Sequence, residues 1–259
     1  MDSDTPNPLQ PATPQEARHD IRTHQRGLFR GQFVIGLGLI LLVLFGAVTA
    51  AVLFLDPLSL DVPITREVQE LQFGPADALL VAVSAPGFAP WNFVFPVVLA
   101  LGIALTKRIA EAGFLLLASL ATMLEEVVKF LVHRARPSAD LVQVFQHLTS
   151  YSFPSGHVTQ YTLVFGFCFY LAFTLMKKGP WRTLCLVLSG AMVVLVGPSR
   201  IWMGQHWASD VLGGYTLGFG LLLIIIWLYR TWEARQVQRQ AANLPSTDQP
   251  AIMRPTTQK

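Results

Sequence analysis

The sequence predicts an all-α membrane protein, folded as a bundle of six transmembrane helices. Hydrophobic residues make up 52% of the 259 residues and charged residues only 14%, against roughly 25% in soluble domains. The mean hydropathy is +0.46. Apolar runs recur along the chain, and about 20 apolar residues are enough for a helix to cross a bilayer. These observations indicate one polytopic membrane domain.

The apolar runs place the spans at about 32–55, 91–106, 113–132, 158–176, 183–196 and 211–228. The first run is too long, and begins too deep in the chain, for a cleaved signal peptide. Residues 64–83 contain amphipathic stretches and are expected to lie along the membrane surface. Gly74-Pro75 and Pro86-Gly87 interrupt this region, because such pairs favour turns.

The two ends of the chain are expected to lie outside the membrane domain, which covers 32–230. Residues 1–31 are interpreted as a disordered, basic cytoplasmic tail and 231–259 as a second cytoplasmic tail, since both lack apolar periodicity. Arginine recurs at every fourth position from Arg18 to Arg30. This spacing suits a short basic helix at the membrane interface. A positive flank to the first span is the favoured explanation.

The distribution of Lys and Arg predicts the orientation. With six spans, the side that holds the termini carries 14 of these residues and the other side carries 5. Cytoplasmic loops are enriched in Lys and Arg, so the termini of this multi-pass protein are expected in the cytoplasm. The opposite ends of spans three to six then face the periplasm or the cell exterior.

Three short motifs, each at an expected membrane boundary on that outer side, carry the chemically active residues. They are Lys129 with Arg136-Pro137, then Pro154-Ser155-Gly156-His157, and finally Ser199-Arg200 with His206 and Asp210.

The first motif and Arg200 supply cations for an anion. Lys129 and Arg136 are seven residues apart, so a helix would place them on one face, and Pro137 would end that helix. Arginine side chains can bind phosphate oxygens through two nitrogens at once, and lysine adds a point charge. The set predicts a phosphate site.

The second and third motifs supply a turn and two imidazoles. Ser155 is expected to be the N-cap of a helix, whose free N–H groups bind anions, and His157 would then lie at the edge of the phosphate. His206 and Asp210 are spaced i, i+4, so one helix face would carry both. A carboxylate on one ring nitrogen leaves the other free to act as a nucleophile.

These motifs resemble the signature of the type-2 phosphatidic acid phosphatases, in the wider superfamily that includes the vanadium haloperoxidases. All eleven signature positions are present: Lys129, Arg136, Pro137, Pro154, Ser155, Gly156, His157, Ser199, Arg200, His206 and Asp210. The order of the three motifs makes the resemblance specific, whereas one of them alone would be weak. By helix count it extends over most of residues 32–230.

The resemblance implies a role for each residue. His206 attacks phosphorus and becomes a phosphohistidine, Asp210 orients it, and His157 protonates the leaving oxygen. The phosphoryl oxygens are bound by the cations and the turn: Lys129, Arg136, Arg200, Ser155 and Gly156. Water then releases phosphate.

Three further charged residues are candidates for supporting the site. Glu125 and Glu126 lie within the third expected span, where acidic residues are costly and usually functional or paired, and Glu125 is well spaced to pair with Lys129. The alternative is that both face a polar cleft without a catalytic part. Arg134 is expected either to add a cation to the site or to extend toward lipid head groups.

The composition excludes several other classes. The net charge of +3 is mild and does not bear on nucleic acid. The basic residues lie at membrane edges and in the motifs and form no stripe with interleaved aromatics, which argues against nucleic acid as a partner. Cys168 and Cys185 lie in apolar runs, and no metal-ligand spacing occurs, so we expect no metal and no cofactor.

The expected function is therefore the metal-independent hydrolysis of a lipid phosphate ester or diphosphate in the membrane. Undecaprenyl diphosphate, phosphatidic acid, phosphatidylglycerophosphate and a lipid A phosphate are the substrate candidates that the resemblance brings. Two alternatives stay open: a phosphotransferase, in which a lipid or sugar hydroxyl replaces water, and a non-catalytic lipid binder or transporter. Intact His157, His206 and Asp210 argue against a binder, which needs only the cations.

Overall fold

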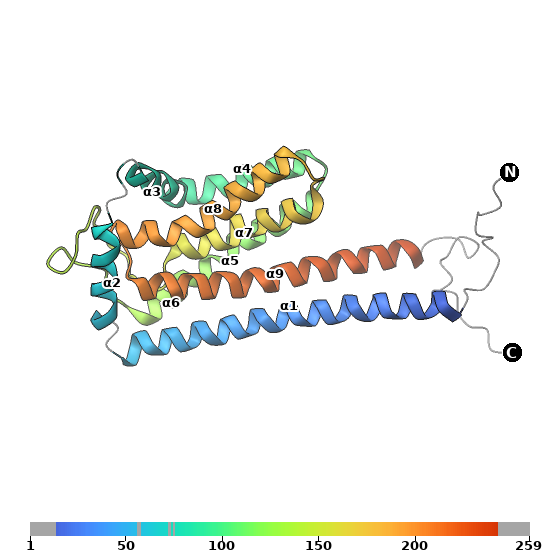
Figure 1. The fold of residues 1–259 in the computed structure, drawn as a ribbon, viewed down its shortest axis with the longest axis horizontal. Helices are drawn as coiled ribbons and strands as arrows, with labels where there is room; N and C mark the ends of the chain where they lie inside the picture. The colour runs from blue at the N-terminus through green and yellow to red at the C-terminus, as the bar shows by residue number, and fades with distance from the viewer. Residues whose placement is uncertain (1–13, 56–57, 72–73, 75, 243–259) are drawn as a thin grey trace. The chain divides into compact units, whose positions relative to one another are not determined.

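The computed structural model describes residues 14–55, 58–71, 74 and 76–242. All regular structure in these residues is helical (Figure 1). The elements are α1 (Pro14–Phe54), α2 (Leu58–Glu70), α3 (Ala76–Ser84), the short 3-10 helix η1 (Ala85–Gly87), α4 (Trp91–Leu105), α5 (Ile109–Ala121), α6 (Met123–Val132), α7 (Gly156–Leu175), α8 (Pro180–Trp202) and α9 (Ala208–Ala242). Of the expected tails, residues 1–13 and 243–259 lie outside the described residues, whereas residues 14–31 and 231–242 belong to helices α1 and α9.

Contacts divide the chain into two units. One unit consists of residues 1–35 and 227–259, whose described part is the beginning of α1 and the end of α9. The other unit, residues 36–226, contains everything between them, including all three motifs.

Four helices in the described residues are long and apolar enough to cross a membrane. They are Gly31–Phe54 within α1, α7, α8 and Ala208–Gln236 within α9, and they match the first, fourth, fifth and sixth expected spans. The chain is thus a multi-pass membrane protein. The second expected span corresponds to α4, which has 15 residues and qualifies only together with Asp77–Gly87, from which it is bent by 77°. The pair would make a fifth crossing.

The third expected span is not one helix. It is divided between α5 and α6, which meet at Thr122. The residues 64–83 also differ from expectation, because they are not one surface segment. Whereas α2 is polar, α3 is apolar and packs against α8, with Val83 in the core that Tyr161 and Val196 share. Burial of its apolar side chains against α8 explains why α3 does not lie free on the surface.

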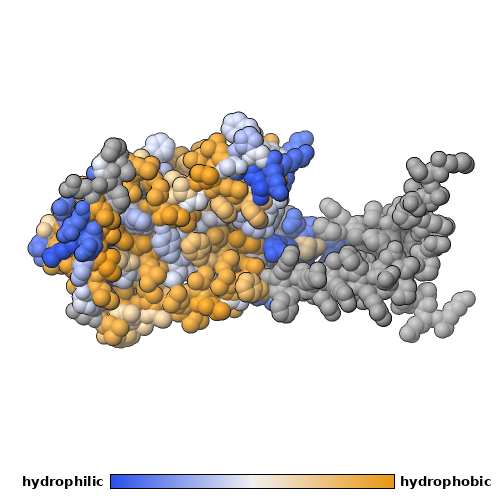
Figure 2. Space-filling model, viewed as in Figure 1, coloured by the Kyte–Doolittle hydropathy of each residue, from blue (hydrophilic) through white to orange (hydrophobic). Residues whose placement is uncertain are grey.

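The surface of the 36–226 unit matches a bilayer environment. Large apolar side chains stay exposed along its helices, for example Val43 on α1, Leu101 on α4 and Val187 on α8. Figure 2 shows hydrophobic residues over the middle of the visible face and hydrophilic residues gathered toward its ends. Contact with the hydrocarbon core of a bilayer would remove these exposed apolar side chains from water.

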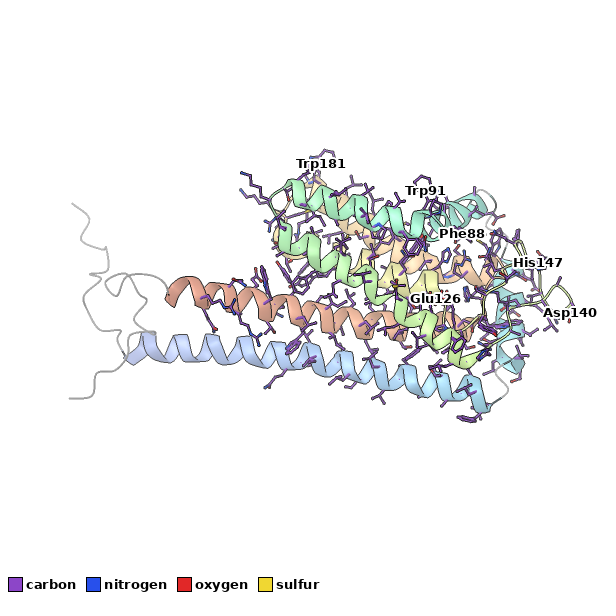
Figure 3. All side chains as sticks on the ribbon, turned by 180° about the vertical axis from the view of Figure 1, so that it is seen from behind. Phe88, Trp91, Glu126, Asp140, His147 and Trp181 are labelled. Carbon is purple, nitrogen blue, oxygen red and sulfur yellow. The ribbon has the colours of Figure 1, made fainter. Side chains whose placement is uncertain are left out.

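One end of the 36–226 unit gathers the connections that carry the motifs. The α6–α7 connection, residues 133–155, reaches the α8–α9 turn, where Phe145 N–H donates to the Met203 carbonyl at 3.2 Å and the Phe145 ring stacks on Trp202 at 4.6 Å. Figure 3 shows Asp140 and His147 at this end and Trp181 at the other. Segments far apart in sequence therefore meet at one level of the bundle.

Candidate active site

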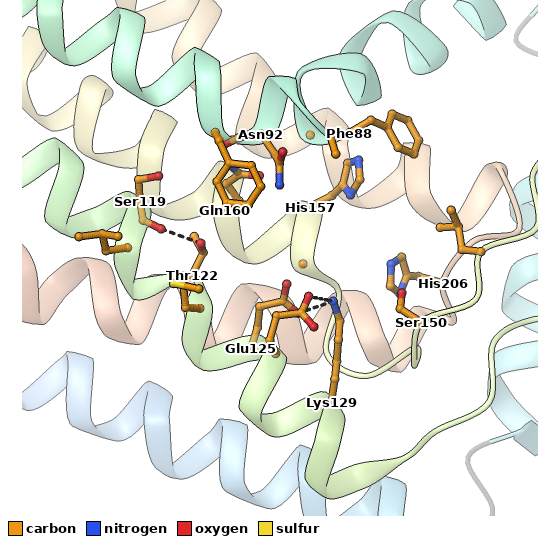
Figure 4. A pocket seen from close by; sticks show the side chains of 18 of the residues that line it. Phe88, Asn92, Ser119, Thr122, Glu125, Lys129, Ser150, His157, Gln160 and His206 are labelled. Atoms are coloured by element: carbon orange, nitrogen blue, oxygen red, sulfur yellow. Dashed lines mark hydrogen bonds and ion pairs between the residues drawn. The ribbon is translucent and has the colours of Figure 1, made fainter.

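The three motifs converge on one cavity of about 270 Å³ (Figure 4). Each motif contributes to its lining, through Lys129 and Arg136, Gly156 and His157, and His206. The predicted site residues Ser155, Arg200 and Asp210 do not line the cavity themselves. Each adjoins a residue that does, since Ser155 precedes Gly156, Arg200 lies over the Phe88 ring and Asp210 lies beside His206. The three motifs therefore come together as predicted, but the two helix faces that were expected to pair their residues are absent.

The first local difference concerns Lys129 and Arg136, which do not share a helix. Helix α6 ends at Val132, and its C-cap His133 adopts the left-handed conformation with φ 53°. The chain then runs without helical structure to Arg136, so Pro137 is not what ends the helix. Both cations still reach the cavity, Lys129 from the helix and Arg136 from the connection.

Lys129 is buried between two carboxylates. Its Nζ lies 2.7 Å from Glu125 Oε2 and 2.9 Å from Glu126 Oε1, and only 8% of the lysine side chain is exposed. Glu125 also lies against the start of α7, where a Cβ on Gly156 would meet Glu125 Oε1 at 2.3 Å. Glu125 thus pairs with Lys129, and a glycine at 156 makes the approach of Glu125 to α7 possible.

The second motif forms the predicted turn into a helix. Ser155 is the N-cap of α7, with φ −71° and ψ 112°, and its backbone N–H donates to the Asp210 carbonyl at 3.1 Å. The Ser155 hydroxyl makes no capping hydrogen bond and has no partner among the described residues. His157 is in the first turn of α7, and its Nε2 is likewise buried without a partner in the described part of the chain.

The third motif begins in the last turn of α8. Ser199 points away from the cavity, because its hydroxyl donates to the Leu80 carbonyl at 2.7 Å and lies 2.6 Å from the Ser84 hydroxyl. Its next neighbour, Arg200, is fully buried, with its guanidinium 5.0 Å from the centre of the Phe88 ring. The Nε and Nη2 atoms of Arg200 have no hydrogen-bond partner in the described structure.

The second local difference concerns His206 and Asp210, which do not share a helix face. His206 lies in the turn before α9, whereas Asp210 is in the first turn of that helix and accepts a hydrogen bond from Trp207 N–H at 2.8 Å. His206 Nδ1 lies 3.5 Å from Asp210 Oδ2, longer than an ordinary hydrogen bond. The imidazole and the carboxylate are nevertheless neighbours, as the spacing predicted.

Arg136 fixes both the connection and the imidazole. Its guanidinium donates to the Ser150 and Gln205 carbonyls at 2.7 and 2.6 Å, and its Nη1 lies 3.2 Å from His206 Nε2. Burial lowers the pKa of Arg136, while the carboxylates Asp210, Glu125 and Glu126 act in the opposite direction. An arginine stays charged under either influence.

The imidazole of His206 is buried among cations. Burial, followed by the charges of Arg136, Arg200 and Lys129, lowers the pKa of His206 well below its ordinary value of 6.5. The neutral ring that results keeps a lone pair, which a nucleophile requires.

Arg134 contributes its cation next to Asp210 and not in the cavity. It does not line this cavity, and only 8% of its side chain is exposed, so it does not extend to head groups. Instead, its guanidinium binds Asp210 from behind and also binds Asp61 of α2. The pairing with Asp61 had no sequence signal, because the two residues are 73 positions apart.

The η1 segment forms a wall of the cavity that no sequence pattern had indicated. The Phe88 ring packs edge-on against His157, with ring centres 4.7 Å apart, and a Cβ on Gly87 would meet His157 Cδ2 at 2.2 Å. Asn92 and Gln160 continue this wall beyond His157. A Pro-Gly pair predicts a turn, but nothing in it specifies which side chain the turn approaches.

Within the described residues, no group of three or more His, Cys, Asp or Glu side chains is arranged to hold a metal ion. Positive charge near the imidazoles comes instead from Lys129, Arg136 and Arg200. Two arginines, a lysine and helix N–H groups around two imidazoles can bind a phosphoryl group and exchange its ester oxygen.

Comparisons with known proteins agree with this geometry. Residues 109–234 match the PAP2 superfamily. The chain is 33% identical over 142 residues to phosphatidylglycerophosphatase B of Bacillus subtilis, which covers 52% of this chain and 66% of that protein. It is 27% identical over 139 residues to an undecaprenyl-diphosphatase of Sulfolobus acidocaldarius, a match that covers 51% of this chain and 63% of that protein. It is 36% identical over 110 residues to the bacitracin transport permease protein BcrC of Bacillus licheniformis, a match that covers 41% of this chain and 49% of that protein. The chain thus spans about half to two thirds of these relatives.

A solved structure shares the fold. The crystal structure of a transmembrane PAP2-type phosphatidylglycerolphosphate phosphatase from Bacillus subtilis superimposes with a TM-score of 0.64 at 24% sequence identity, over 76% of this chain and 96% of that one.

Proposed function

Because the chain belongs to the PAP2 superfamily, we propose that it is an integral membrane lipid phosphatase, which hydrolyses a lipid phosphate through a phosphohistidine. The relatives named above as a phosphatidylglycerophosphatase and an undecaprenyl-diphosphatase support this class of substrate. The local geometry supports the reaction.

One observation carries the proposal: several buried polar groups of the three motifs have no hydrogen-bond partner among the described residues. Two nitrogens of Arg200 and the Ser155 hydroxyl have no hydrogen-bond partner among the described residues, nor has His157 Nε2. Buried donors normally find a partner, and leaving one unpaired costs about 1–3 kcal/mol. A phosphoryl group that reaches from the cavity to these donors would supply the acceptor oxygens that they lack.

In the proposed reaction, His206 Nε2 attacks phosphorus. A bond forms between nitrogen and phosphorus as the ester oxygen leaves, and His157 gives that oxygen a proton. Asp210 stabilises the positive ring that forms on His206. Arg200, Arg136 and Lys129 stabilise the charge on the phosphoryl oxygens, which is the main task in phosphoryl transfer. Water then attacks the phosphohistidine, with His157 as the base, and free phosphate leaves.

For the substrate, we place a glycerolipid phosphomonoester of the phosphatidylglycerophosphate class first. Beyond His157 the cavity is lined by neutral groups such as Asn92, Gln160 and Ser119, which can bind hydroxyl groups. An isoprenoid diphosphate is the second candidate, supported by the relative from Sulfolobus acidocaldarius.

We further propose six crossings and an outward-facing site. The α5–α6 pair would make the additional crossing, with its break at Thr122. The charge distribution of 14 against 5 supports cytoplasmic termini and a cavity at the periplasmic or extracellular end.

The proposal is tested by phosphate release from purified lipids in detergent, with EDTA present. Phosphatidylglycerophosphate, phosphatidic acid and undecaprenyl diphosphate are compared at equal surface concentration, and His206→Ala is the inactive control. Release that withstands EDTA supports the proposal, and the fastest lipid identifies the substrate class. Transfer to an added alcohol without hydrolysis indicates a phosphotransferase. Tight binding without turnover of any lipid indicates a binder, and either result overturns the proposed hydrolysis.

A further inference from the structure

A second set of buried charges lies behind the site, on the side of Asp210 away from the cavity. Arg134 occupies its centre, with its Nη2 2.5 Å from Asp61 Oδ2 and its Nη1 bound to Asp210 Oδ1. The side chains of Arg134, Asp61 and Asp210 are only 8%, 3% and 0% exposed. Three charged groups at such depth are costly unless each is paired.

Asp61 holds the beginning of α9 from another helix. It lies in the first turn of α2, which crosses the end of the 36–226 unit (Figure 1). Its Oδ1 accepts a hydrogen bond from Ser209 N–H at 2.9 Å, and its Oδ2 accepts one from the Ser209 hydroxyl at 2.6 Å. Free N–H groups in the first turn of a helix need such acceptors. Asp61 therefore fixes the residue that directly precedes Asp210.

The net charge of Asp61, Arg134 and Asp210 determines how much negative charge acts on His206. Asp210 and Arg134 alone would form a neutral pair, and the imidazole of His206 would experience little negative charge. Asp61 shares the guanidinium, so that two carboxylates face one cation and one negative charge is left over. Ser152 and Trp207 N–H hold the other oxygen of Asp210, Oδ2, which lies 3.5 Å from His206 Nδ1.

We propose that Asp61 is a positioning residue for the reaction: it offsets the charge of Arg134, so that the negative charge of Asp210 stays available to His206. The inference rests on the proposed function, because it concerns the charge that His206 gains when it attacks phosphorus. Asp61 touches neither the cavity nor His206, and it acts only through Arg134, Ser209 and Asp210.

The proposal predicts a charge effect beyond a structural one. Asp61→Asn keeps the shape of the side chain and removes its charge, so Arg134 is left to neutralise Asp210. The positive ring on His206 is then less stable, and kcat falls about tenfold to a hundredfold, the size of effect expected for one lost charge partner. Glu67→Gln removes one charge from an exposed position on the same helix and should leave kcat unchanged.

The pH profile separates charge from structure. The groups that face His206 are Asp210 from α9, Arg136 from the α6–α7 connection, Arg200 from α8, Lys129 from α6 and His157 from α7. With less negative charge behind Asp210, protonation of His206 becomes harder, so the acid limb of kcat/KM should move to lower pH in Asp61→Asn. Ser209→Ala, which loosens the contact but keeps all charges, should lower thermal stability without moving that limb.

A double variant completes the test. In Asp61→Asn with Arg134→Gln, the cation and its counter-charge are both gone and Asp210 keeps its own charge. The acid limb should then return to the wild-type pH or lie above it, and this variant carries the test if the single one does not fold. An Asp61→Asn enzyme that folds and keeps the wild-type rate and pH profile overturns the inference. Failure of the wild type to release phosphate from any lipid would instead overturn the proposed function.

Discussion

His206 Nε2 lies 3.2 Å from Nη1 of Arg136, so this ring nitrogen faces a cation. A guanidinium can only donate, so this nitrogen must be the acceptor and the ring proton belongs on Nδ1, toward Asp210. This is the tautomer that a nucleophile on Nε2 requires. Arg136 therefore presets the ring, in addition to its proposed role in binding phosphate.

The two imidazoles should differ when they are replaced. His206→Ala should abolish both turnover and phosphoenzyme, because no other residue supplies the attacking nitrogen. His157→Ala should slow turnover by roughly a hundredfold to ten-thousandfold, the usual contribution of general acid–base catalysis, and least for substrates with a good leaving group. His147→Ala, an exposed change in the α6–α7 connection, is the control.

Rapid quenching with labelled substrate measures the phosphoenzyme in each variant. The roles of nucleophile and acid would have to be exchanged if a phosphoenzyme persisted in His206→Ala and disappeared in His157→Ala.

Activity should persist at mildly acidic pH. The pKa of His206 is lowered well below 6.5 by burial and by three cations, so the folded enzyme keeps this ring neutral where an ordinary histidine is protonated. The acid limb of kcat/KM, which reports the free enzyme, should therefore lie below pH 6.5. An acid limb above that pH, measured with a substrate whose own ionisation has been subtracted, would contradict this assignment.

The free energy of unfolding should also depend on the protonation of His206, and it should decrease as pH falls. The unfolded chain takes up a proton on His206 near pH 6.5, while the folded protein does not. The contribution of this residue is thus fully present above that pH and is lost progressively as pH falls toward the folded pKa. Thermal melting in detergent from pH 7.5 to 5 should show a fall that His206→Gln, which cannot titrate, reduces.

Gly156 should resist substitution more than a lipid-facing glycine. A Cβ there would lie 2.3 Å from Glu125 Oε1, so Gly156→Ala must push the carboxylate away and disturb Lys129. We expect a loss of about 1–3 kcal/mol in stability, as for other overpacked sites, together with a raised KM. Gly113→Ala on α5 meets no atom within 4 Å and should be neutral or slightly stabilising.

Melting temperature and KM for one lipid test the pair of glycine variants. Equal behaviour of both would mean that Glu125 moves freely and that its contact with α7 is unimportant.

The sequence predicted the long apolar helices better than it predicted the breaks between the shorter ones. Hydropathy located the long helices α1, α7, α8 and α9 well, because an apolar run of bilayer length has few other uses. It could not show that α5 and α6 divide at Thr122, since the break lies inside a continuous apolar run. The amphipathic signal over 64–83 concealed α3, whose partner α8 is more than a hundred residues away in sequence.

At the site, the residue types and the order of the motifs predicted which residues come together, whereas their helical spacing predicted the wrong local structure. The spacings of Lys129 and Arg136, and of His206 and Asp210, suggested shared helix faces, yet tertiary contacts place Arg136 and His206 outside helices. Long-range partners such as Asp61 and Phe88 carry no local pattern, so only the folded chain reveals them.

The orientation is open to a direct labelling test. In a background with Cys168 and Cys185 replaced by Ala, a cysteine at Ala139, next to Ser138, should react with an impermeant thiol reagent added to intact cells. A cysteine at Gly179 should react only after permeabilisation. Both positions are exposed, so differences in reactivity report the side of the membrane and not burial. The motivation is the excess of Lys and Arg on the side that includes Lys177 and Lys178. If the labelling pattern is reversed, the cavity opens to the cytoplasm, and the lipid must present its phosphate from the inner leaflet.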